Sequence, residues 1–258
     1  MLDDILAAHR LAAAADDRSL RDLASAALDS PPPRPFRAAI SQPGLSVIAE
    51  IKRRSPSKGD LAPDLDPASL AGAYEAGGAA AVSVLTDRAF FGGSPDDLTA
   101  ARAGCSLPVM RKDFIVDERD VYDARLMGAD AVLLIVAALN QTKLNRMRAL
   151  AGYLGMAALV EIHTEEELDK AIACGADLVG VNQRDLRTFQ VDRSLAFRIA
   201  PQIPDTMTKV AESGIASADY LVALADAGYD AALVGERLVT AADPAAALTE
   251  LRQGLSSP

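Results

Sequence analysis

The chain has 258 residues, 50% of them hydrophobic, and can therefore bury a sizeable core as one barrel domain or as two smaller domains. Aromatic residues make up only 4% and tryptophan is absent, so the core must be built from aliphatic side chains. The formal net charge of −10 argues against nucleic acid or an anionic membrane as a partner, because both require a basic surface.

The start of the chain and its cysteines indicate the compartment. Residues 1–4 are acidic at positions 3 and 4, and neither a basic segment nor a long apolar stretch follows, so we expect no secretory signal. No run of about 18 apolar residues predicts a membrane span. Cys105 and Cys174 lie far apart, without the spacing of metal ligands, as in a protein with reduced, buried thiols. We expect a cytoplasmic protein without a metal site.

Residues 1–45 precede the first strand-like segment. Residues 2–15 and 20–28 have helical patterns, and the proline-rich segment 31–35 favours an extended connection. This N-terminal helical extension is too short for a domain and too apolar for a solvated tail. Two interpretations stay open: two helices and a strap that pack on the rest of the protein, or a plug for the floor of a barrel.

Short apolar segments then alternate with amphipathic ones to the end of the chain. Eight of them are strand-like, at residues 47–51, 80–85, 108–112, 131–136, 157–162, 178–182, 208–212 and 231–235. Alternating strands and helices predict parallel strands with right-handed crossovers. Eight such units predict a (β/α)8 TIM barrel, as a single domain over residues 1–258. A doubly wound open sheet is the alternative, but no Gly-x-Gly-x-x-Gly follows the first strand.

Local signals mark the ends of the helices. Asp66, Ser94 and Asp243 each precede a proline, which predicts an N-cap followed by proline at the first helical position. Thr164 and Glu167 have the spacing of a capping box. Six glycines are expected to cap helices at their carboxyl ends: Gly77, Gly104, Gly128, Gly155, Gly175 and Gly228.

Charged and polar residues stand at the carboxyl ends of five predicted strands. They are Glu50 and Lys52, Lys112, Glu161, Asn182 with Arg184, and Glu212 with Ser213. Residues two apart on a strand share a face, so these side chains are expected to converge in the mouth of the barrel, where barrel enzymes place their chemistry. A single Glu-x-Lys pair would be a structural ion pair. Three carboxylates and two lysines together predict a catalytic site, because burying them all would be costly.

Two loop glycines and the two histidines are the remaining candidates for a functional role. Gly214 and Gly235 follow the seventh and eighth strands, where barrels often bind phosphate through backbone N–H groups, although ordinary turn glycines are also common there. The two histidines carry little signal: His9 is expected on the surface of the first helix, and His163 is expected only to cap or solvate the helix that follows it.

Six segments in register resemble the indole-3-glycerol phosphate synthase family. They are residues 48–59, 110–116, 160–163, 181–186, 210–215 and 233–236, and residues 84–86 and 90–92 also fit. Gln183 replaces an asparagine that is common in the family. The resemblance implies a (β/α)8 barrel with an N-terminal extension over the active face. It implies conversion of 1-(2-carboxyphenylamino)-1-deoxyribulose 5-phosphate to indole-3-glycerol phosphate, CO₂ and water in tryptophan biosynthesis. Because the chain ends at Pro258, we expect a monofunctional enzyme.

The resemblance also implies roles for individual residues. Lys112 is the general acid and Glu161 its acid/base partner, with Glu50 and Lys52 beside them. Lys52 also reaches the phosphate and assists dehydration, while Asn182 and Glu212 orient hydroxyl groups. The remaining catalytic, substrate-binding and phosphate-binding residues are Ser55, Pro56, Phe91, Phe114, Leu133, Arg184, Ser213, Gly214, Leu233, Gly235 and Glu236. No step requires a cofactor or a metal.

Two other functions remain possible from the residues alone. A phosphate-binding barrel isomerase, such as phosphoribosylanthranilate isomerase, would place a cysteine at the end of the first strand, where this chain has Glu50 and Lys52. A catalytically silent barrel scaffold would not need every charged strand-end residue. We expect a small-molecule substrate and a monomer or weak homo-oligomer. We also expect coupled pKa values in the cluster, with the cation of Lys52 making the proton of Lys112 easier to release.

Overall fold

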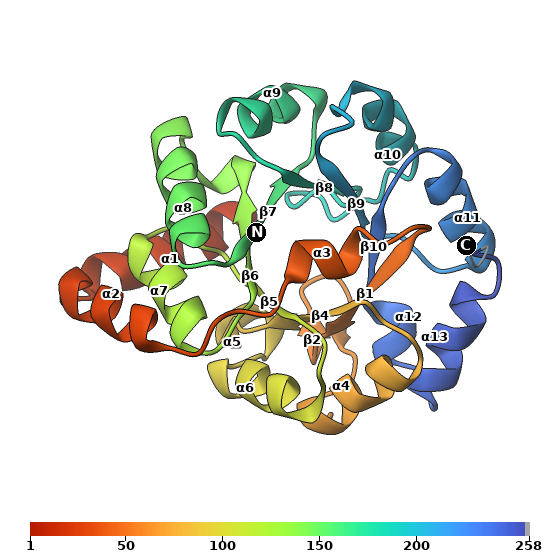
Figure 1. Cartoon of the computed structure of the whole chain (residues 1–258), viewed down its shortest axis with the longest axis horizontal. Coiled ribbons are helices and arrows are strands. Elements are labelled where there is room, and N and C mark those ends of the chain that lie inside the picture. The colour runs from red at the N-terminus through yellow and green to blue at the C-terminus, as the bar shows by residue number, and fades with distance from the viewer. Residues whose placement is uncertain (256–258) are drawn as a thin grey trace.

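Eight parallel strands close into a barrel in this structure, a computed structural model that describes residues 1–255 (Figure 1). The strands are β1 (Ser46–Ile51), β4 (Ala81–Leu85), β5 (Val109–Lys112), β6 (Ala131–Ile135), β7 (Ala157–Ile162), β8 (Leu178–Asn182), β9 (Thr208–Glu212) and β10 (Ala231–Val234). Consecutive strands are neighbours, and β10 pairs with β1, so the sheet has no open edge. The expected (β/α)8 barrel is confirmed, and the doubly wound sheet is wrong. Residues 256–258 of the expected domain lie outside the described residues.

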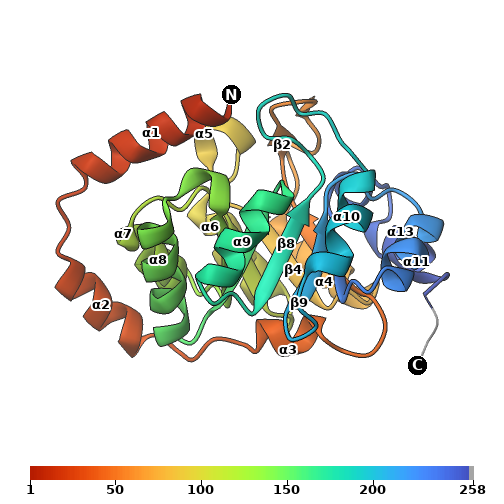
Figure 2. The same ribbon diagram turned by 90° about the horizontal axis from the view of Figure 1, so that it is seen from above.

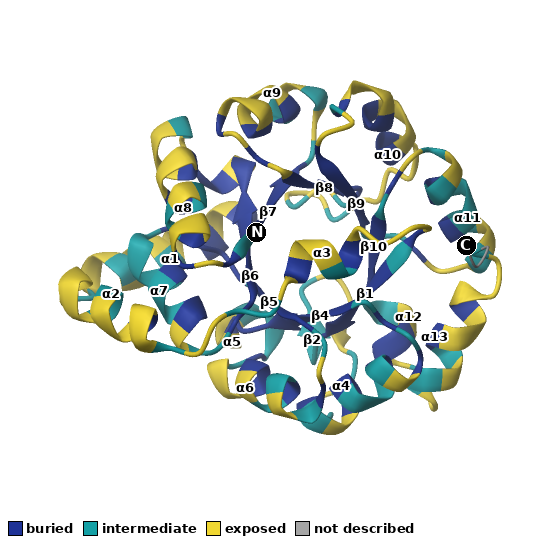
Figure 3. Ribbon diagram, viewed as in Figure 1, coloured by how far each residue is buried: buried dark blue, intermediate teal, exposed yellow. Residues whose placement is uncertain are grey.

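One longer helix follows each strand and packs on the outside of the barrel. These helices are α4 (Pro67–Ala76), α6 (Pro95–Gly104), α7 (Glu118–Leu126), α8 (Gln141–Tyr153), α9 (Glu165–Ala173), α10 (Ser194–Ile199), α11 (Ala218–Asp226) and α13 (Pro244–Arg252). Short elements decorate the loops: the hairpin of β2 (Arg54–Ser55) and β3 (Gly59–Asp60), α5 (Arg88–Phe91), η1 (Val136–Ala138), η2 (Ala200–Gln202) and α12 (Glu236–Val239). The strands are almost entirely buried and the helices are exposed on their outer faces (Figure 3).

The helix signals were mostly correct. Asp66, Ser94 and Asp243 accept hydrogen bonds from the backbone N–H of the third residue of α4, α6 and α13, as expected of N-caps. The capping box at Thr164 is only half formed, because the Glu167 carboxylate accepts from the N–H of His163 instead.

One of the six glycine expectations was wrong, that for Gly104. Gly128, Gly155, Gly175 and Gly228 adopt positive φ just beyond their helices, as expected. Gly77 is the C-cap of α4, as expected, although its φ is −76° and the left-handed residue is the following Gly78. Gly104 is the last residue of α6, and its lack of a side chain lets the backbone of Ala68 approach closely.

The N-terminal extension wraps the barrel from one end to the other. The helix α1 (Leu2–Ala15) lies at the end where the strands finish, α2 (Leu20–Asp29) packs against α7 at the side, and α3 (Phe36–Ile40) lies at the opposite end (Figure 2). Phe36 and Ile40 are fully buried there. Both interpretations of the extension are therefore correct in part, since α1 and α2 pack on the barrel while α3 plugs its floor.

The strap between α2 and α3 is held by polar contacts to the barrel floor. The Arg34 N–H donates to the buried carboxylate of Asp130 at 2.6 Å, and its guanidinium donates to the carbonyls of Cys105 and Leu107. On α7, the guanidinium of Arg125 donates to the carbonyls of Ser30 and Pro31. These contacts fix the extension, so that α1 is delivered to the face where the polar strand ends converge.

Candidate active site

A cavity of about 870 Å³ opens at the carboxyl ends of the strands. Every one of the eight strands, or the loop directly after it, contributes to its wall. All of the site residues expected from the sequence line it: Glu50, Lys52, Ser55, Pro56, Phe91, Lys112, Phe114, Leu133, Glu161, Asn182, Arg184, Glu212, Ser213, Gly214, Leu233, Gly235 and Glu236. Strand parity correctly brought Glu50, Lys52, Lys112, Glu161 and Glu212 together, whereas the loop residues in this set were expected from the family resemblance.

A lysine between two buried carboxylates forms the centre of the cavity floor. The Nζ of Lys112 lies 2.8 Å from Oε2 of Glu161 and 3.2 Å from Oε2 of Glu212. The side chain of Glu161 is fully buried and that of Glu212 is 1% exposed. Glu50 and Lys52 form a second ion pair next to this group. The cluster thus holds two ammonium groups and three carboxylates in little contact with water.

The pKa of Lys112 is raised, which contradicts the expectation of an easily released proton. Burial alone lowers the pKa of this ammonium, but the carboxylates of Glu161, Glu212 and Glu50 outweigh burial. The neighbouring cation of Lys52 was expected to dominate, and it does not, because Lys52 is itself paired with Glu50. Lys112 is therefore fully protonated before any ligand enters.

The two carboxyl groups that contact Lys112 have opposite pKa shifts. Burial raises the pKa of both groups. At Glu161, the charge of Lys112 and the ring of His163 reverse this effect, so the pKa is lowered and the group is ionised. At Glu212, the pKa stays raised, because Lys112 compensates only partly for burial and the charge of Glu161 adds to it. The site therefore separates a permanent carboxylate from a carboxyl that holds its proton more readily.

An apolar wall faces this polar floor. The rings of Phe91 and Phe114 have centroids 6.2 Å apart, and Pro56 and Leu133 line the same cavity. Phe91 comes from α5 and Phe114 from the loop after β5, so two loops build the wall. Such a surface suits a planar aromatic group.

The loops after β9 and β10 bring Ser213, Gly214, Gly235 and Glu236 to the cavity wall. Ser213 and Gly214 have φ values of 68° and 72°, a left-handed turn that is unusual for serine. The backbone N–H groups of Gly214, Gly235 and Glu236 make no hydrogen bond to any residue that the structure describes. The Glu236 carboxylate pairs with Lys58, which lies in the loop of the β2–β3 hairpin. Free amides with a nearby ammonium can bind an anion.

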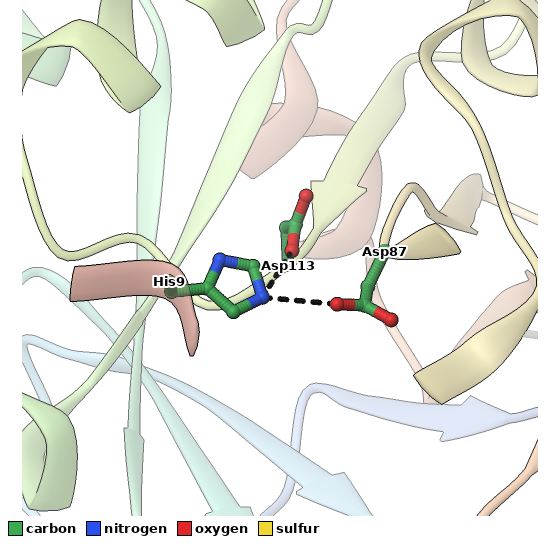
Figure 4. A group of neighbouring side chains, drawn as sticks. All are labelled: His9, Asp87 and Asp113. Atoms are coloured by element: carbon green, nitrogen blue, oxygen red, sulfur yellow. Dashed lines mark hydrogen bonds and ion pairs between the residues drawn. The ribbon is translucent and has the colours of Figure 1, made fainter. Parts of the chain in front are cut away.

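The sequence predicted that His9 lies on the surface, but in the structure its ring contacts two carboxylates. Its Nε2 lies 2.9 Å from Oδ2 of Asp87 and 3.9 Å from Oδ1 of Asp113, and its side chain is 20% exposed (Figure 4). The ring also lies 5.6 Å from that of Phe114. The pKa of His9 is raised, mainly by the hydrogen bond to Asp87, against burial, which lowers it. The ring therefore attaches α1 to the rim of the cavity.

This group is the one set of three potential metal ligands found among residues 1–255, but it does not suit a metal ion. Asp87 already accepts from the N–H groups of Phe90 and Phe91, and Asp113 accepts from Thr86, Arg111 and the N–H of Phe114. The guanidinium of Arg111 lies 2.8 Å from Asp113, where it would repel a cation. We interpret the group as a polar attachment of α1.

His163 is also more than a loop residue. It is 12% exposed and lies between Glu161 and Glu167, with Nε2 3.3 Å from Oε1 of Glu161 and Nδ1 3.4 Å from Oε2 of Glu167. Sequence reasoning missed this role, and also missed Asp87 and Asp113, which line the cavity. The rule that polar residues at strand ends face the mouth could have found both aspartates, since Asp87 and Asp113 follow β4 and β5.

No helix among the described residues is long and apolar enough to cross a membrane. Among solved structures, the fold is similar to a 3-hexulose-6-phosphate synthase, with a TM-score of 0.64 and 18% identity over 82% of this chain and all of the other. It is also similar to a thiamine phosphate pyrophosphorylase from Pyrococcus furiosus, with a TM-score of 0.61 and 19% identity over 81% of this chain and 94% of that one. These similarities concern the fold alone.

Similarity in sequence is much higher to one family. The family model for indole-3-glycerol phosphate synthase matches residues 2–251. Proteins named indole-3-glycerol phosphate synthase from Mycobacterium avium and Mycobacterium tuberculosis are each 51% identical over 253 residues, which is 97% of this chain and 93% of theirs. With the barrel, the lysine–carboxylate cluster and the apolar wall in place, the chain belongs to the indole-3-glycerol phosphate synthase family.

Proposed function

We propose that this chain converts 1-(2-carboxyphenylamino)-1-deoxyribulose 5-phosphate to indole-3-glycerol phosphate, with Lys112 as the general acid. Membership in the family makes the protein a carboxy-lyase of tryptophan biosynthesis. The observation that carries the assignment of roles is the ammonium of Lys112, held between Glu161 and Glu212 on the floor of a cavity with an apolar wall. The reaction needs a proton donor next to a bound aromatic ring, and this arrangement supplies both.

Ring closure is the step in which Lys112 acts. The aromatic carbon that carries the carboxylate attacks the ketone carbon, and the ketone oxygen takes the proton of Lys112 as the new bond forms. Because the pKa of Lys112 is raised, its amino group is protonated at neutral pH and can act as the donor. The ionised carboxylate of Glu161 holds the ammonium by a hydrogen bond of 2.8 Å. After ring closure it can accept a proton released in a later step and pass that proton to the neutral amine of Lys112.

Decarboxylation and dehydration follow on the same floor. The bond to the carboxylate breaks, CO₂ leaves, and the electron pair restores the aromatic ring. The hydroxyl on the former ketone carbon then leaves with a proton as water, while the neighbouring CH₂ loses a proton to a cavity carboxylate. Lys52, paired with Glu50, assists this dehydration and reaches toward the phosphate. Asn182 and Glu212 orient the hydroxyl groups of the substrate.

The walls of the cavity place the substrate. Pro56, Phe91, Phe114 and Leu133 hold the aromatic ring, and Leu233 closes the apolar side. Ser55 and Arg184 contact polar groups. The free amides of Gly214, Gly235 and Glu236, with the turn at Ser213, take the phosphate.

The proposal also includes the domain organisation, compartment, oligomeric state and partners of the protein. We take residues 1–258 as a single domain and the protein as a cytoplasmic monomer or weak homo-oligomer that needs no cofactor. The net charge of −10 supports the absence of nucleic acid and membranes as partners. It also means that the substrate, with its carboxylate and its phosphate, must be attracted by local cations such as Lys52 and Lys58.

Formation of the indole ring tests the function directly. The protein has no tryptophan, so fluorescence of the indole product can be followed without a protein background from that residue. We expect equal amounts of indole-3-glycerol phosphate and CO₂ from the purified protein and the carboxyphenylamino substrate. Consumption of substrate without release of CO₂ would contradict the assignment.

A further inference from the structure

His163 stands behind the catalytic floor and not on it. It follows β7 directly, two residues after Glu161, and precedes Thr164, the N-cap of α9. Glu161 lines the cavity, whereas His163 does not. The ring is largely buried, with its Nε2 3.3 Å from Oε1 of Glu161. It can therefore act on the chemistry only through Glu161.

The far side of the ring is fixed by α9. The Nδ1 lies 3.4 Å from Oε2 of Glu167, a residue of the first turn of α9. The same oxygen of Glu167 accepts the backbone N–H of His163 at 2.7 Å. This is the contact that leaves the capping box at Thr164 incomplete. The Glu167 carboxylate therefore faces the second nitrogen of the imidazole and does not complete the helix cap.

A ring with a carboxylate near each nitrogen favours the imidazolium form, in which both nitrogens carry a proton. Burial lowers the pKa of His163, but Glu161 and Glu167 outweigh it and raise the pKa to about 9. Asp185, in the loop after β8, also interacts with the charge of this ring. The cation of Lys112 lies on the opposite side of Glu161.

The two oxygens of Glu161 are thus divided between two cations. Oε2 faces Lys112 and Oε1 faces His163. Without the ring, Oε1 of this fully buried carboxylate would lose the cation that faces it, and Lys112 alone would have to offset the burial of Glu161 and Glu212.

We propose that His163, as an imidazolium, is a positioning residue that keeps Glu161 ionised and oriented toward Lys112. The inference rests on the proposed roles of Lys112 and Glu161. It deepens them by naming the group that keeps Glu161 available as the proton partner. His163 itself touches no substrate.

The kinetic test compares the protein with His163→Gln and Glu167→Gln. His163→Gln keeps a hydrogen-bond donor but removes the charge, so kcat should fall by about tenfold or more, because removing one charge of a buried ion pair is costly. The KM should stay within about twofold, because the ring does not line the cavity. In the unmodified protein, kcat should fall as pH rises through about 9. Glu167→Gln keeps an acceptor for the N–H of His163 and should move this fall to lower pH, whereas His163→Gln should abolish it.

Direct titration of the ring provides a test that does not depend on activity. The chain has only 2 histidines, so His9→Gln leaves His163 as the single imidazole for NMR. Its titration midpoint should lie near about 9 and should fall toward the ordinary value in Glu161→Gln. This measurement needs no substitution of His163 itself, so it holds even where His163→Gln fails to fold.

Three results would overturn the inference: a midpoint near the ordinary value that Glu161→Gln leaves unchanged, a kcat of His163→Gln equal to that of the unmodified protein at every pH, or a raised KM with unchanged kcat. Failure of the proposed function is recognised separately. In that case the unmodified protein forms no indole product, while the NMR titration still decides whether His163 and Glu161 are linked.

Discussion

The carboxylate of Glu212 occupies the space that a side chain at Gly180 would fill. A Cβ at position 180 would collide with Oε1 of Glu212 and lie 3.2 Å from Cδ1 of Leu159. Gly180 and Glu212 belong to the neighbouring strands β8 and β9, in which Gly180 is paired with Val210. The glycine thus gives Glu212 room to lie 3.2 Å from Lys112. The absence of a side chain at position 180 therefore helps to place a carboxyl group on the cavity floor.

Gly180→Ala is expected to displace Glu212 and lower kcat by about tenfold or more, because a hydrogen bond to a charged group is worth roughly 1.5–3 kcal/mol. Steady-state kinetics will measure the effect. Gly152→Ala is the matched control, since Gly152 lies exposed in α8 and nothing approaches its Cβ position within 4 Å. The control should keep full activity and gain about 0.5–1 kcal/mol in helix stability. Equal kcat for both alanine variants would show that the space beside Glu212 has no importance.

Gly235 has the same relationship with Glu50. Its place after the eighth strand predicts a role in phosphate binding, but in the structure a Cβ at position 235 would collide first with Oε1 of Glu50. Gly235→Ala should therefore lower kcat, through displacement of Glu50 from Lys52, in addition to weakening the binding of phosphate. Affinity for indole-3-glycerol phosphate, measured by calorimetry, separates the two effects. Weakened product binding with normal kcat would restrict Gly235 to the phosphate.

Lys112→Ala and Lys112→Arg should both lose most turnover, by about 100-fold to 10,000-fold, the usual range for a general acid. Arginine keeps the positive charge between Glu161 and Glu212 but does not release a proton readily. Affinity for the product should change much less than kcat in the arginine variant. Near-native turnover of Lys112→Arg would exclude Lys112 as the acid.

The polar floor could be predicted from the sequence because it depends on local geometry. Strand parity places Glu50 with Lys52 on one face, and the carboxyl ends of parallel strands meet at one end of a barrel. The eight strands themselves were located to within one residue at either end. The facing of the side chains and the bounds of the strands depend only on residues close in sequence and on the closure of the barrel.

The histidine contacts could not be predicted in this way. His9 reaches Asp87 across 78 residues, and only the path of the proline-rich strap brings α1 to that rim. His163 lies close in sequence to Glu161 and Glu167, yet the rotamers that join them depend on how α9 packs. The prediction for the pKa of Lys112 was wrong for a related reason. The net effect of three neighbouring carboxyl groups and the paired Lys52 depends on the distances between the side chains, and the spacing of residues in the sequence does not give these distances.

The raised pKa of His163 predicts a pH dependence of stability. A group whose pKa is higher in the folded protein stabilises it fully below the unfolded pKa, here 6.5, and this stabilisation is lost as pH rises through about 9. The contribution is on the order of 3 kcal/mol at most. The urea midpoint should fall between pH 6 and pH 10 by more in the unmodified protein than in His163→Gln. Identical falls in the two proteins would place the pH dependence in other groups, such as Glu212, whose raised pKa acts in the same direction.

The attachment of α1 should also depend on pH, through His9. The ring faces Asp87 in the loop after β4, Asp113 in the loop after β5 and Asp120 in α7. Asp113 is itself paired with Arg111 of β5. The pKa of His9 is raised by Asp87 first, so the attachment is complete below pH 6.5 and weakens as pH rises through the higher folded value.

Hydrogen exchange of residues 2–15 measures this attachment directly. Corrected for the intrinsic rate, exchange should be faster at pH 8.5 than at pH 6, and His9→Ala should exchange fast at both. Leu11→Ala is the matched control, because Leu11 lies on the same helix and is 73% exposed. It should keep the pH dependence of the unmodified protein. The buried side chains of Leu2, Ile5 and Leu6 keep α1 partly docked in every variant, so the expected loss is local opening and not unfolding of the barrel. Slow exchange in His9→Ala at pH 6 would show that these apolar contacts alone hold the helix.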